Sequence, residues 1–504
     1  MRYILIADVG TTSMKTSLFT RDLRCLGTIA GEYKLRSLPN GVIELDPEAY
    51  WTQFCQGTRQ ICEHCGVTPD QIERIGITTQ GETIIPVDGT GRALRDAIVW
   101  LDTRAQAESC MIASQIDMDI FRRNTGIADM TAVWPLCKLL WIKGHEPEVY
   151  QRTAYFLLLE DYLILRLTGR FVSNKGVSCT TGYYDILHDR LWTEILEQFA
   201  LDPDKIPEIL DCGTPVGTVE PAVCAALGFA SDTLVVTTAM DQVSSAIGSG
   251  SAQEGVFTET TGTVVAIAVT GDRQALLSPR PVTTYWHALR DKYLICPICM
   301  TGGMVLKWYK DELCQAEQQE AARRGISVYS LLDEQAEKSP PMSNGLLTIP
   351  YFNGSFQPSF RPQARGVIFG LGLENTQSDI TRSILESIAF MLRENVEMIA
   401  EQCGLTPRQL RCCGGGGSSS VWNQIKADVC GLPACSLVNH ETTSLGAAAV
   451  SLFPEYGEEQ VLALLDKTIL IRQTYVPSPE RHQLYTSGYR RYQALFQALA
   501  DQFG

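Results

Sequence analysis

The feature that most constrains the fold is a strand–turn–strand segment that occurs twice, once near the start of each half of the chain. The first is YILIADVGTTSMKTSLFT (residues 3–20) and the second is GVFTETTGTVVAIAVT (residues 255–270). Each has two apolar runs joined by a short turn rich in Gly and Thr, which is the pattern of a β-hairpin. The repetition predicts two related domains that each begin with a hairpin.

Helical and strand patterns alternate behind each hairpin. A helix is predicted over residues 46–66, with Asp46 as its cap, and a buried strand follows at 72–80. Residues 145–169 have a mainly helical pattern, and residues 377–404 have that of a long amphipathic helix. This alternation favours an α/β architecture of helices layered on sheets. A chain of 504 residues is too long for one core, so we expect two domains, 1–246 and 247–504.

The charge of the chain limits its partners. Its formal net charge is −15 and its pI is near 5.0, which argues against nucleic acid because phosphate backbones repel an acidic protein. The apolar stretch at 155–167 is interrupted by three charged residues, so no membrane span is expected. Seventeen cysteines, without a signal-peptide pattern at the N-terminus, predict reduced thiols in the cytoplasm.

Two cysteine pairs have the spacing of zinc ligands. They are CEHC (Cys62 and Cys65) and CPIC (Cys296 and Cys299). The pairs lie more than two hundred residues apart, one in a predicted helix and one in a predicted strand. Free cysteines that pack as small apolar side chains are the alternative, and we favour it.

The two hairpin turns, DVGTTSMK and TTGTVV, suit a phosphate group. Glycine lets a turn close around an anion, while Thr hydroxyls and backbone N–H groups donate hydrogen bonds to its oxygens. Lys15 would add positive charge, and Asp8 could hold a metal ion. Ordinary β-turns contain the same residues, but two such turns in matching places favour ligand binding.

A glycine loop, GGGGSSS (residues 414–420), connects a predicted strand to a predicted helix. Consecutive glycines permit close approach of a ligand to the backbone, and the N-terminus of the following helix favours an anion. A surface turn without a ligand is the alternative. The strand before the loop and the patterned helix after it favour the binding site.

Polar residues at predicted strand ends suit a polyhydroxylated ligand. They occur in TTQGET (residues 78–83) and in WLDTR (residues 100–104), where Trp100 would stack on a sugar face while Gln80, Glu82, Asp102 and Arg104 pair with hydroxyls. Core packing of Trp100 and a surface pair of Asp102 with Arg104 are the alternatives. In TTAMDQVSSAIGSG (237–250), Asp241 stands between a strand pattern and small residues, with only Gln242 as a polar neighbour.

Several enzyme classes are disfavoured by missing motifs. The chain has no Walker A loop, no G-x-G-x-x-G after a strand, no H-E-x-x-H and no G-x-S-x-G. The sequence therefore argues against a P-loop enzyme, a Rossmann dehydrogenase, a zincin and an α/β-hydrolase.

Taken with these motifs, the chain resembles the FGGY carbohydrate kinases, a family of the actin-like ATPase superfamily that includes xylulokinase and glycerol kinase. The most specific match is GVIFGLGLENTQSDITRSILE (366–386), which fits the second signature pattern of the family. PLCKLLWIK (135–143) approximates the first, with Val133 where that pattern usually has Tyr, Phe or a small residue. The resemblance implies two actin-like (ribonuclease H-like) α/β domains with ATP and a sugar in a cleft between them.

The resemblance also implies a role for each candidate residue. Asp241 would be the general base toward the attacking hydroxyl, and Asp8 and Asp241 would be the metal-binding candidates for Mg²⁺. The residues expected around the nucleotide are Asp8, Gly10, Thr11, Thr12, Lys15, Gly262, Thr263, Gly303, Gly415, Gly416 and Ser420. Those expected to face the sugar are Gln80, Gly81, Glu82, Trp100, Asp102, Asp241 and Gln242. Dimers are usual among such proteins, so a homodimer is the expected assembly.

Departures from the family bear on the substrate. Glycerol kinases carry Arg-Glu where this chain has Gly81-Glu82, and xylulokinases usually carry Met-His. Glycine in place of arginine is expected to leave space beside Glu82, which favours a pentulose, with glycerol or another polyol as the alternative. A non-catalytic actin-like protein that binds sugar or nucleotide is an alternative of another class. Intact Asp8, Asp241 and hairpin turns favour the kinase.

Overall fold

The chain divides into two units in the computed structural model, and neither unit is a single stretch of sequence. The structure describes residues 2–278, 282–355, 357, 359, 361–439 and 441–503. The first unit comprises Met1–Ala252, Gly271–Leu294 and Glu441–Ile469, and the second comprises Gln253–Thr270, Ile295–His440 and Leu470–Gly504. The expected domains 1–246 and 247–504 stay a prediction.

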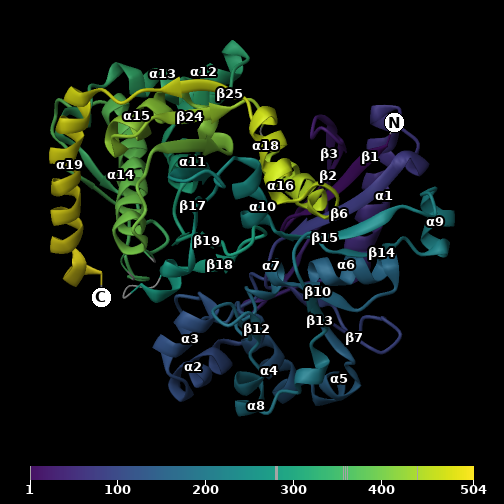
Figure 1. The fold of residues 1–504 in the computed structure, drawn as a ribbon. Coiled ribbons are helices and arrows are strands. Elements are labelled where there is room, and N and C mark those ends of the chain that lie inside the picture. Colours follow the sequence, from purple (N-terminus) through teal and green to yellow (C-terminus); the bar gives the residue numbers. More distant parts are fainter. Residues whose placement is uncertain are drawn as a thin grey trace. The chain divides into compact units, whose positions relative to one another are not determined.

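The first predicted hairpin lies at the centre of the main sheet of the first unit (Figure 1). β1 and β2 pair antiparallel with Asp8 opposite Lys15, while β6 runs parallel to β1 and β15 parallel to β6. The sheet contains, in spatial order, β14 (Pro215–Thr218), β15 (Leu234–Met240), β6 (Ile72–Thr79), β1 (Tyr3–Val9), β2 (Ser13–Thr20) and β3 (Cys25–Glu32).

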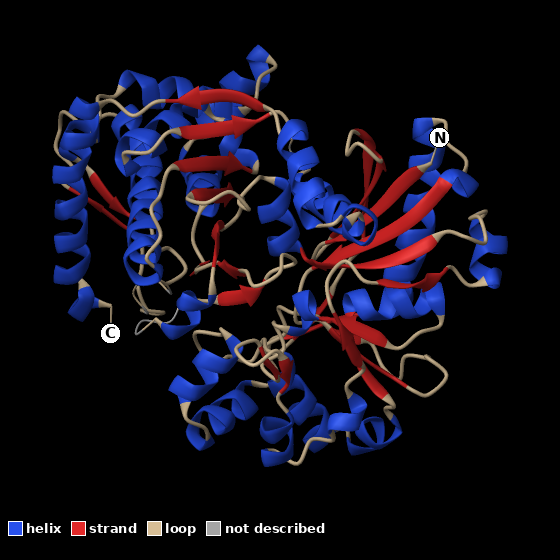
Figure 2. Ribbon diagram, viewed as in Figure 1, coloured by secondary structure: helices blue, strands red, loops and turns tan. Residues whose placement is uncertain are grey.

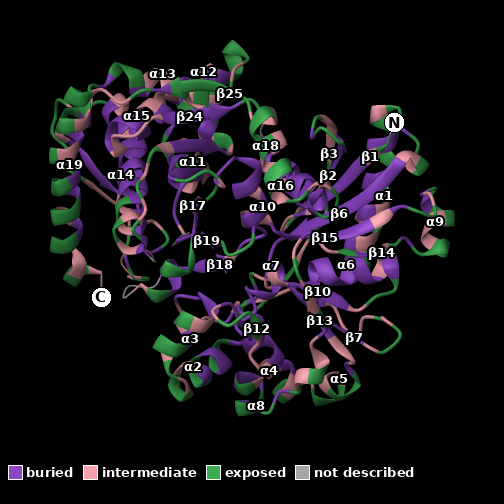
Figure 3. Ribbon diagram, in the orientation of Figure 1, coloured by how far each residue is buried: buried purple, intermediate pink, exposed green. Residues whose placement is uncertain are grey.

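Successive side chains of β1 point to opposite faces of the sheet, and each face is covered by helices. Leu5, Ala7 and Val9 are fully buried in a core that includes Tyr50 and Phe54 of α1 (Pro47–Cys65), and Figure 3 shows β1, β6 and β15 as almost wholly buried. Asp46 caps α1 as predicted. On the face that carries Ile6, a Cβ added to Gly76 of β6 would lie 3.6 Å from Ser451, the last residue of α16 (Thr442–Ser451).

Two helices of the first unit approach each other backbone to backbone. They are α10 (Asp241–Gly248) and α16, which are about two hundred residues apart in the chain. A Cβ added to Gly248 would lie 1.9 Å from the Thr442 carbonyl oxygen, and one added to Gly446 would lie 1.8 Å from that of Ser244. Only glycine fits at these two positions, and α16 also packs on β1, β6 and β15.

Residues 145–169 are mainly helical, as predicted, but the helical pattern is interrupted by a strand. Tyr155–Leu158 form a strand, β9, because this apolar run pairs antiparallel with β7. β9 belongs to a sheet with β4 (Arg36–Leu38), β5 (Val42–Leu45), β8 (Ala97–Ile98) and β7 (Ile84–Val87). The smaller strands of this unit are β10 (Val172–Asn174), β11 (Tyr184–Asp185), β12 (Arg190–Leu191), β13 (Glu208–Leu210) and β18 (Thr284–Trp286), and β19 (Tyr293–Ile295) continues into the second unit.

The remaining helices of the first unit surround these sheets (Figure 2). They are α2 (Gln106–Gln115), α3 (Met118–Thr125), α4 (Pro135–His145), α5 (Pro147–Arg152), α6 (Leu159–Thr168), α7 (Lys175–Ser178), α8 (Thr193–Gln198), α9 (Pro221–Leu227), α17 (Phe453–Tyr456) and α18 (Glu458–Thr468). Among the described residues of the whole chain, no helix is both long and apolar enough to cross a membrane.

The second unit repeats the strand plan of the first. Its predicted hairpin, β16 and β17, is antiparallel; β23 runs parallel to β16, β24 parallel to β23, and an antiparallel strand follows at each side. β20 (Ile298–Cys299) pairs with β17 (Val265–Gly271), and from β17 the strands follow in the order β16 (Val256–Thr261), β23 (Gln409–Cys413), β24 (Ala434–Leu437) and β25 (Ile471–Tyr475). Order and direction match those of β3, β2, β1, β6, β15 and β14, which confirms the predicted repetition.

Helices of the second unit follow the sequence pattern closely. The long amphipathic helix is α14 (Gln377–Cys403), with Asp379 in its capping box and Gly404 after its end in the left-handed conformation (φ 65°). The others are α11 (Gly303–Leu313), α12 (Gln315–Arg324), α13 (Val328–Lys338), α15 (Ser420–Cys430) and α19 (Pro479–Ala498), and β21 (Leu347–Ile349) pairs with β22 (Val367–Phe369).

Candidate active site

Three candidate residues of the first unit lie at the ends of neighbouring parallel strands. Asp8 is the penultimate residue of β1, Gln80 directly follows β6, and Asp241 directly follows β15. Because these strands are parallel, their carboxyl ends meet at one edge of the sheet, which is where α/β proteins bind ligands. The fold therefore brings together three residues that the sequence placed far apart.

The charge of Asp241 acts on the carboxyl group of Asp8. Burial and the charge of Asp241 raise the pKa of Asp8 to about 7, and nearby Lys15 opposes this shift. Burial raises the pKa of Asp241 to about 6, although hydrogen bonds from the backbone and side chain of Gln242 counteract it. Two desolvated carboxylates that repel each other form a place where a cation is favoured.

This pair fits Mg²⁺ better than a metal held by protein alone. Within the described residues, no group of three or more His, Cys, Asp or Glu side chains could hold a metal ion. Mg²⁺ takes carboxylate oxygens and is usually bound by one or two of them, with phosphates and water completing its shell. Asp8 and Asp241 are suited to that partial role.

The first hairpin turn is rigidly held. Gly10 donates its N–H to the Ser13 carbonyl (3.0 Å), and Tyr33 donates its N–H to the Thr12 carbonyl (3.0 Å) and its hydroxyl to the Ser13 carbonyl (3.2 Å). Thr12 is exposed and Thr11 is half-buried. Lys15, which the sequence predicted as a phosphate ligand, forms an ion pair with Glu441 at 2.8 Å.

Trp100 connects this turn to the predicted sugar wall, the set of residues expected to face the sugar (Gln80, Gly81, Glu82, Trp100, Asp102, Asp241 and Gln242). Its Nε1 donates to Oγ1 of Thr11 (2.9 Å), and its backbone N–H donates to Oγ1 of Thr83 (3.1 Å). Glu82 lies close enough to Asp241 to feel its charge. Burial and the charge of Asp241 both raise the pKa of the Glu82 carboxyl. Gln80 is buried and donates its backbone N–H to the Val9 carbonyl (3.1 Å).

The space expected beside Gly81 is filled. A Cβ added to Gly81 would lie 2.9 Å from Oγ1 and 3.0 Å from Cγ2 of Thr180. Thr180 is fully buried, and its hydroxyl donates to the Val177 carbonyl (2.9 Å), which fixes the side chain in place. The sequence argument that glycine leaves room for a larger sugar is therefore wrong in its physical basis.

The carboxylate of Asp102, which the sequence predicted to face the sugar, is occupied by hydrogen-bond donors of the protein. Its side chain is fully buried, and its carboxylate accepts hydrogen bonds from Nε and NH2 of Arg104 (2.9 and 2.7 Å) and from the Ile43 N–H (2.6 Å). The pairing with Arg104 occurs as one alternative expected, but the pair is buried and not on the surface. Asp102 supports the loop after Trp100.

The second hairpin turn holds the start of a helix in the second unit. Gly303, the first residue of α11, donates to the Gly262 carbonyl (3.0 Å), and Met304 donates to that of Thr263 (2.9 Å). A Cβ added to Gly303 would lie 2.3 Å from the Gly262 carbonyl oxygen. The turn and the helix start are thus in direct contact, and the role of Gly262, Thr263 and Gly303 toward a nucleotide stays a prediction.

The glycine loop closes against the strand that leads into this turn. A Cβ added to Gly416 would lie 2.6 Å from the Thr261 side chain, whereas one added to Gly415 would meet nothing within 4 Å. Gly415 is therefore open to a ligand. Ser420 is exposed at the first turn of α15 and lines a cavity of about 570 Å³ with Val421, Gln424 and Arg382.

Sequence reasoning missed two buried lysines near these sites. Lys426 of α15 forms an ion pair with Glu259 at 2.5 Å, and Glu259 accepts a hydrogen bond from the Thr261 hydroxyl, so the pair anchors the second turn. Lys138 of α4 donates to the Glu82 carbonyl at 2.8 Å. Lys138 lies in PLCKLLWIK, a segment that the sequence analysis matched to the family without assigning a role.

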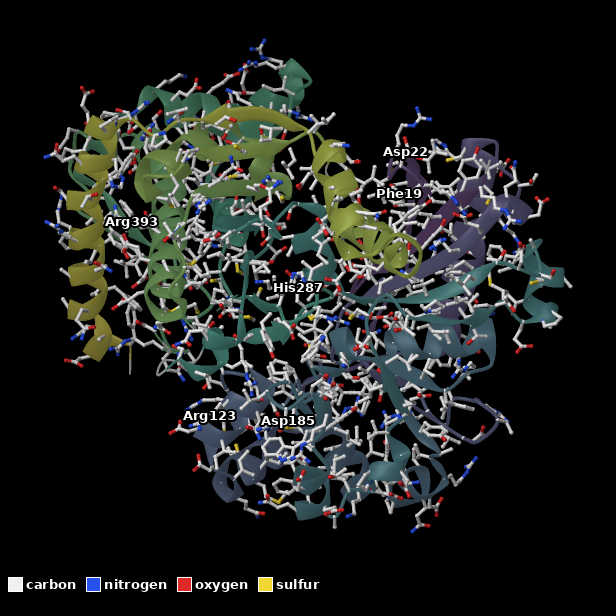
Figure 4. All side chains as sticks on the ribbon, in the orientation of Figure 1. Phe19, Asp22, Arg123, Asp185, His287 and Arg393 are labelled. Carbon is white, nitrogen blue, oxygen red and sulfur yellow. The ribbon has the colours of Figure 1, made fainter. Side chains whose placement is uncertain are left out.

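His287 and the cysteine thiols are less suited to exchange a proton than the acidic residues at the strand ends. His287, labelled in Figure 4, belongs to the first unit, and burial lowers its pKa to about 3, so it is neutral at physiological pH. All seventeen cysteines are free thiols, and burial raises the pKa of Cys62 to about 11. The acidic residues at the strand ends remain the groups best placed to exchange a proton.

The match to known families decides between a carbohydrate kinase and a non-catalytic actin-like binding protein. Residues 3–248 match the N-terminal domain of the FGGY family of carbohydrate kinases, and residues 260–453 match its C-terminal domain. The chain belongs to the FGGY family of carbohydrate kinases. It is accordingly a sugar kinase, a phosphotransferase with two actin-like domains, and ATP is the phosphate donor in this family.

Relatives and solved structures agree with this assignment over the whole chain. The chain is 25% identical to "Xylulose kinase" of Bacillus subtilis, covering 99% of this chain and 98% of that protein, and 26% identical to "Autoinducer-2 kinase" of Klebsiella pneumoniae, covering 100% and 95%. The crystal structure of xylulose kinase from Rhodospirillum rubrum superposes with a TM-score of 0.89 at 26% identity and covers 100% of both chains.

Proposed function

We propose that this FGGY kinase transfers the γ-phosphate of ATP to a hydroxyl of a pentulose, with Asp241 as the general base. The observation that carries the proposal is the meeting of Asp8, Asp241 and Glu82 at one edge of the sheet, where the charge of Asp241 raises the pKa values of Asp8 and Glu82. Asp241 would accept the hydroxyl proton as the sugar oxygen bonds to the γ-phosphorus and the bond to ADP breaks.

Binding roles follow from the geometry of each unit. In the first unit, the N–H groups and hydroxyls of Thr11 and Thr12 and the Lys15 ammonium would contact phosphate oxygens, Gly10 would let the turn approach them closely, and Asp8 with Asp241 would hold Mg²⁺. When bound, Mg²⁺ neutralises phosphate charge. In the second unit, Gly262, Thr263, Gly303, Gly415, Gly416 and Ser420 would contact the nucleotide. Gln80, Glu82, Trp100 and Gln242 would contact the sugar, and Asp102 would act on it only through the loop.

A pentulose comes first because the relatives include a xylulose kinase. Glycerol and other polyols are the alternative, since Thr180 takes the space that would have argued against a small substrate. The free state of all seventeen thiols supports a cytoplasmic location, and a homodimer is the proposed assembly.

A substrate screen tests the proposal. ADP release with Mg²⁺-ATP is measured over glycerol, erythritol and the four pentuloses, with autoinducer-2 added because of the second relative. We expect the highest kcat/KM with a pentulose. A clear preference for glycerol would overturn the pentulose assignment, and no turnover with any of these substrates would contradict the substrate class as a whole.

A further inference from the structure

Lys138 occupies an unusual position for a lysine. It lies on α4 and is fully buried, with no exposed surface. Its ammonium donates to three backbone carbonyls, those of Glu82 (2.8 Å), Val99 (3.1 Å) and Trp100 (3.4 Å). An ammonium has three N–H donors and each finds an oxygen here. A buried charge is costly, so the arrangement needs a reason.

Comparison with the other buried lysine shows what is special about this one. Lys426 neutralises a carboxylate, because its ammonium lies 2.5 Å from Glu259. Lys138 instead donates hydrogen bonds to backbone carbonyls. Among the described residues, no carboxylate forms an ion pair with its ammonium. It is close enough to Glu82 and Asp102 for their charges to act on it. Its contacts therefore fix the course of the backbone.

The backbone that Lys138 holds is strained. Glu82 has φ 61°, in the left-handed region that side chains other than glycine rarely adopt, and Thr83 donates its N–H to the Gly81 carbonyl at 2.7 Å, which closes a three-residue turn around Glu82. Strained residues persist only where their surroundings hold them. The shortest contact of Lys138 is with the carbonyl of Glu82 itself.

The same ammonium ties this turn to the segment before Trp100. Two of its acceptors are the Val99 and Trp100 carbonyls, and the Trp100 N–H reaches back to Oγ1 of Thr83. The turn that carries Glu82 and the strand end that carries Trp100 are therefore fastened at two points. Either residue would move if the ammonium were removed.

We propose that Lys138 is a positioning residue for sugar recognition: its ammonium holds the Glu82 turn and the Trp100 strand end together, so that the carboxylate and the indole face the sugar in a fixed arrangement. This inference rests on the proposed function of Glu82 and Trp100. Lys138 acts through these two residues and does not itself touch the substrate.

The test compares Lys138→Gln and Lys138→Met with Lys143→Met in the full-length protein. Lys143 lies on the same helix and also donates to backbone carbonyls, those of Phe199 and Ala200, away from the Glu82 turn. Hydrogen exchange of the Thr83 and Trp100 amides is measured without substrate, and kcat and both KM values are measured with the best sugar of the wild-type screen.

We expect faster exchange at both amides and a sugar KM raised about tenfold or more in Lys138→Gln, because buried carbonyls lose their donor. The KM for ATP should change less than about threefold, and Lys143→Met should resemble the wild type in amide exchange and in both KM values.

Lys138→Met should show a larger effect than Lys138→Gln, which keeps two N–H donors. If Lys138→Met does not fold, the result for Lys138→Gln tests the proposal. A folded Lys138→Gln with wild-type exchange at both amides would overturn the proposal, whether or not its sugar KM or its melting temperature changes.

Failure of the proposed function gives a different result. If the wild type phosphorylates none of the sugars, the substrate assignment is wrong, whereas the exchange measurement still tests whether Lys138 holds the turn. Unchanged exchange would refute the positioning role even when the wild type is an active sugar kinase.

Discussion

The indole Nε1 of Trp100 lies 2.9 Å from Oγ1 of Thr11 and donates a hydrogen bond to it. Trp100 comes from the predicted sugar wall and Thr11 from the first phosphate turn. One bond thus joins residues that are proposed to hold the two substrates of the reaction. A change in the position of either residue is transmitted to the other.

A double-mutant cycle measures this connection. Trp100→Phe keeps the aromatic ring and removes the donor, and Thr11→Val keeps the branched side chain and removes the acceptor. We expect a coupling of about 0.5–1.5 kcal/mol in the activation free energy from kcat/KM of the sugar. Strictly additive effects of the two substitutions would show that the bond carries no functional coupling.

Asp241→Asn should lower kcat at least ~10²-fold while both substrates still bind, because an amide cannot accept the hydroxyl proton. Binding is followed by calorimetry and turnover by ADP release. In the wild type, kcat should fall as the pH drops below about 6, where the Asp241 carboxylate becomes protonated. Near-normal turnover in the variant would remove Asp241 from the role of base.

Lys15 and Glu441 allow charge loss to be separated from loss of an ion pair. Lys15→Met should raise the KM for ATP about tenfold if the ammonium binds phosphate. Glu441→Gln also breaks the pair seen at 2.8 Å but leaves the ammonium in place, so the KM for ATP should not rise. If both variants raise it equally, the ion pair matters and a direct phosphate contact does not.

Gly81→Ala should lower kcat/KM for the sugar and destabilise the protein by about 1–3 kcal/mol, because the new Cβ would press on Thr180 at 2.9–3.0 Å. Adding Thr180→Ala should restore much of both losses. Gly89→Ala is the matched control, since a Cβ there meets nothing within 4 Å. Chemical denaturation and steady-state kinetics give the two readouts, and a silent Gly81→Ala would contradict the close packing.

Glu160 should make the stability of the protein depend on pH. One carboxylate oxygen accepts the Thr238 N–H at 2.9 Å, and burial raises the pKa of this carboxyl to about 8 although hydrogen bonds from Thr238 and Asn174 oppose the shift. The folded state therefore holds a proton that the unfolded state loses near pH 4.5, so stability falls as the pH rises from about 5 to 8.

Glu160→Gln has an uncharged side chain like that of the protonated acid. The variant should therefore lack the fall in stability that Glu160 causes between about pH 5 and 8. Relative to the wild type, the variant should gain stability on going from pH 5 to pH 8, by on the order of a few kcal/mol. Urea denaturation at several pH values measures it, with the exposed Glu148→Gln as control. A constant difference between variant and wild type across this range would show that Glu160 is ionised in the folded protein.

The backbone plan was largely predictable because it depends on local patterns. Asp46 and Gly66 mark the ends of a helix through capping, and the alternation in residues 3–20 and 255–270 gives the two hairpins. Asp8 and Asp241 were predictable as single acids next to apolar strands. Their meeting follows from parallel pairing with β6, which a pattern of residues does not specify.

The errors come from contacts between distant residues. Tyr155–Leu158 became a strand because β7 offered it a partner, which outweighs local propensity. Thr180 fills the space at Gly81, and the Ile43 N–H donates to the carboxylate of Asp102; neither partner is evident from the neighbouring sequence. The pairing of Asp102 with Arg104 was expected as an alternative, but not its burial. Lys138 was missed because a lysine in a helix usually faces water.

The close fit of α16 onto α10 has a consequence for synthesis of the protein. The helix that completes the first unit begins at Thr442, although most of that unit ends at Ala252. At 5–20 residues per second, the ribosome would need roughly ten to forty seconds to supply the missing segment. During that time the backbone of α10 at Ser244 and Gly248 lacks its contact with α16. The N-terminal part of this kinase therefore cannot complete its folding until translation is nearly over.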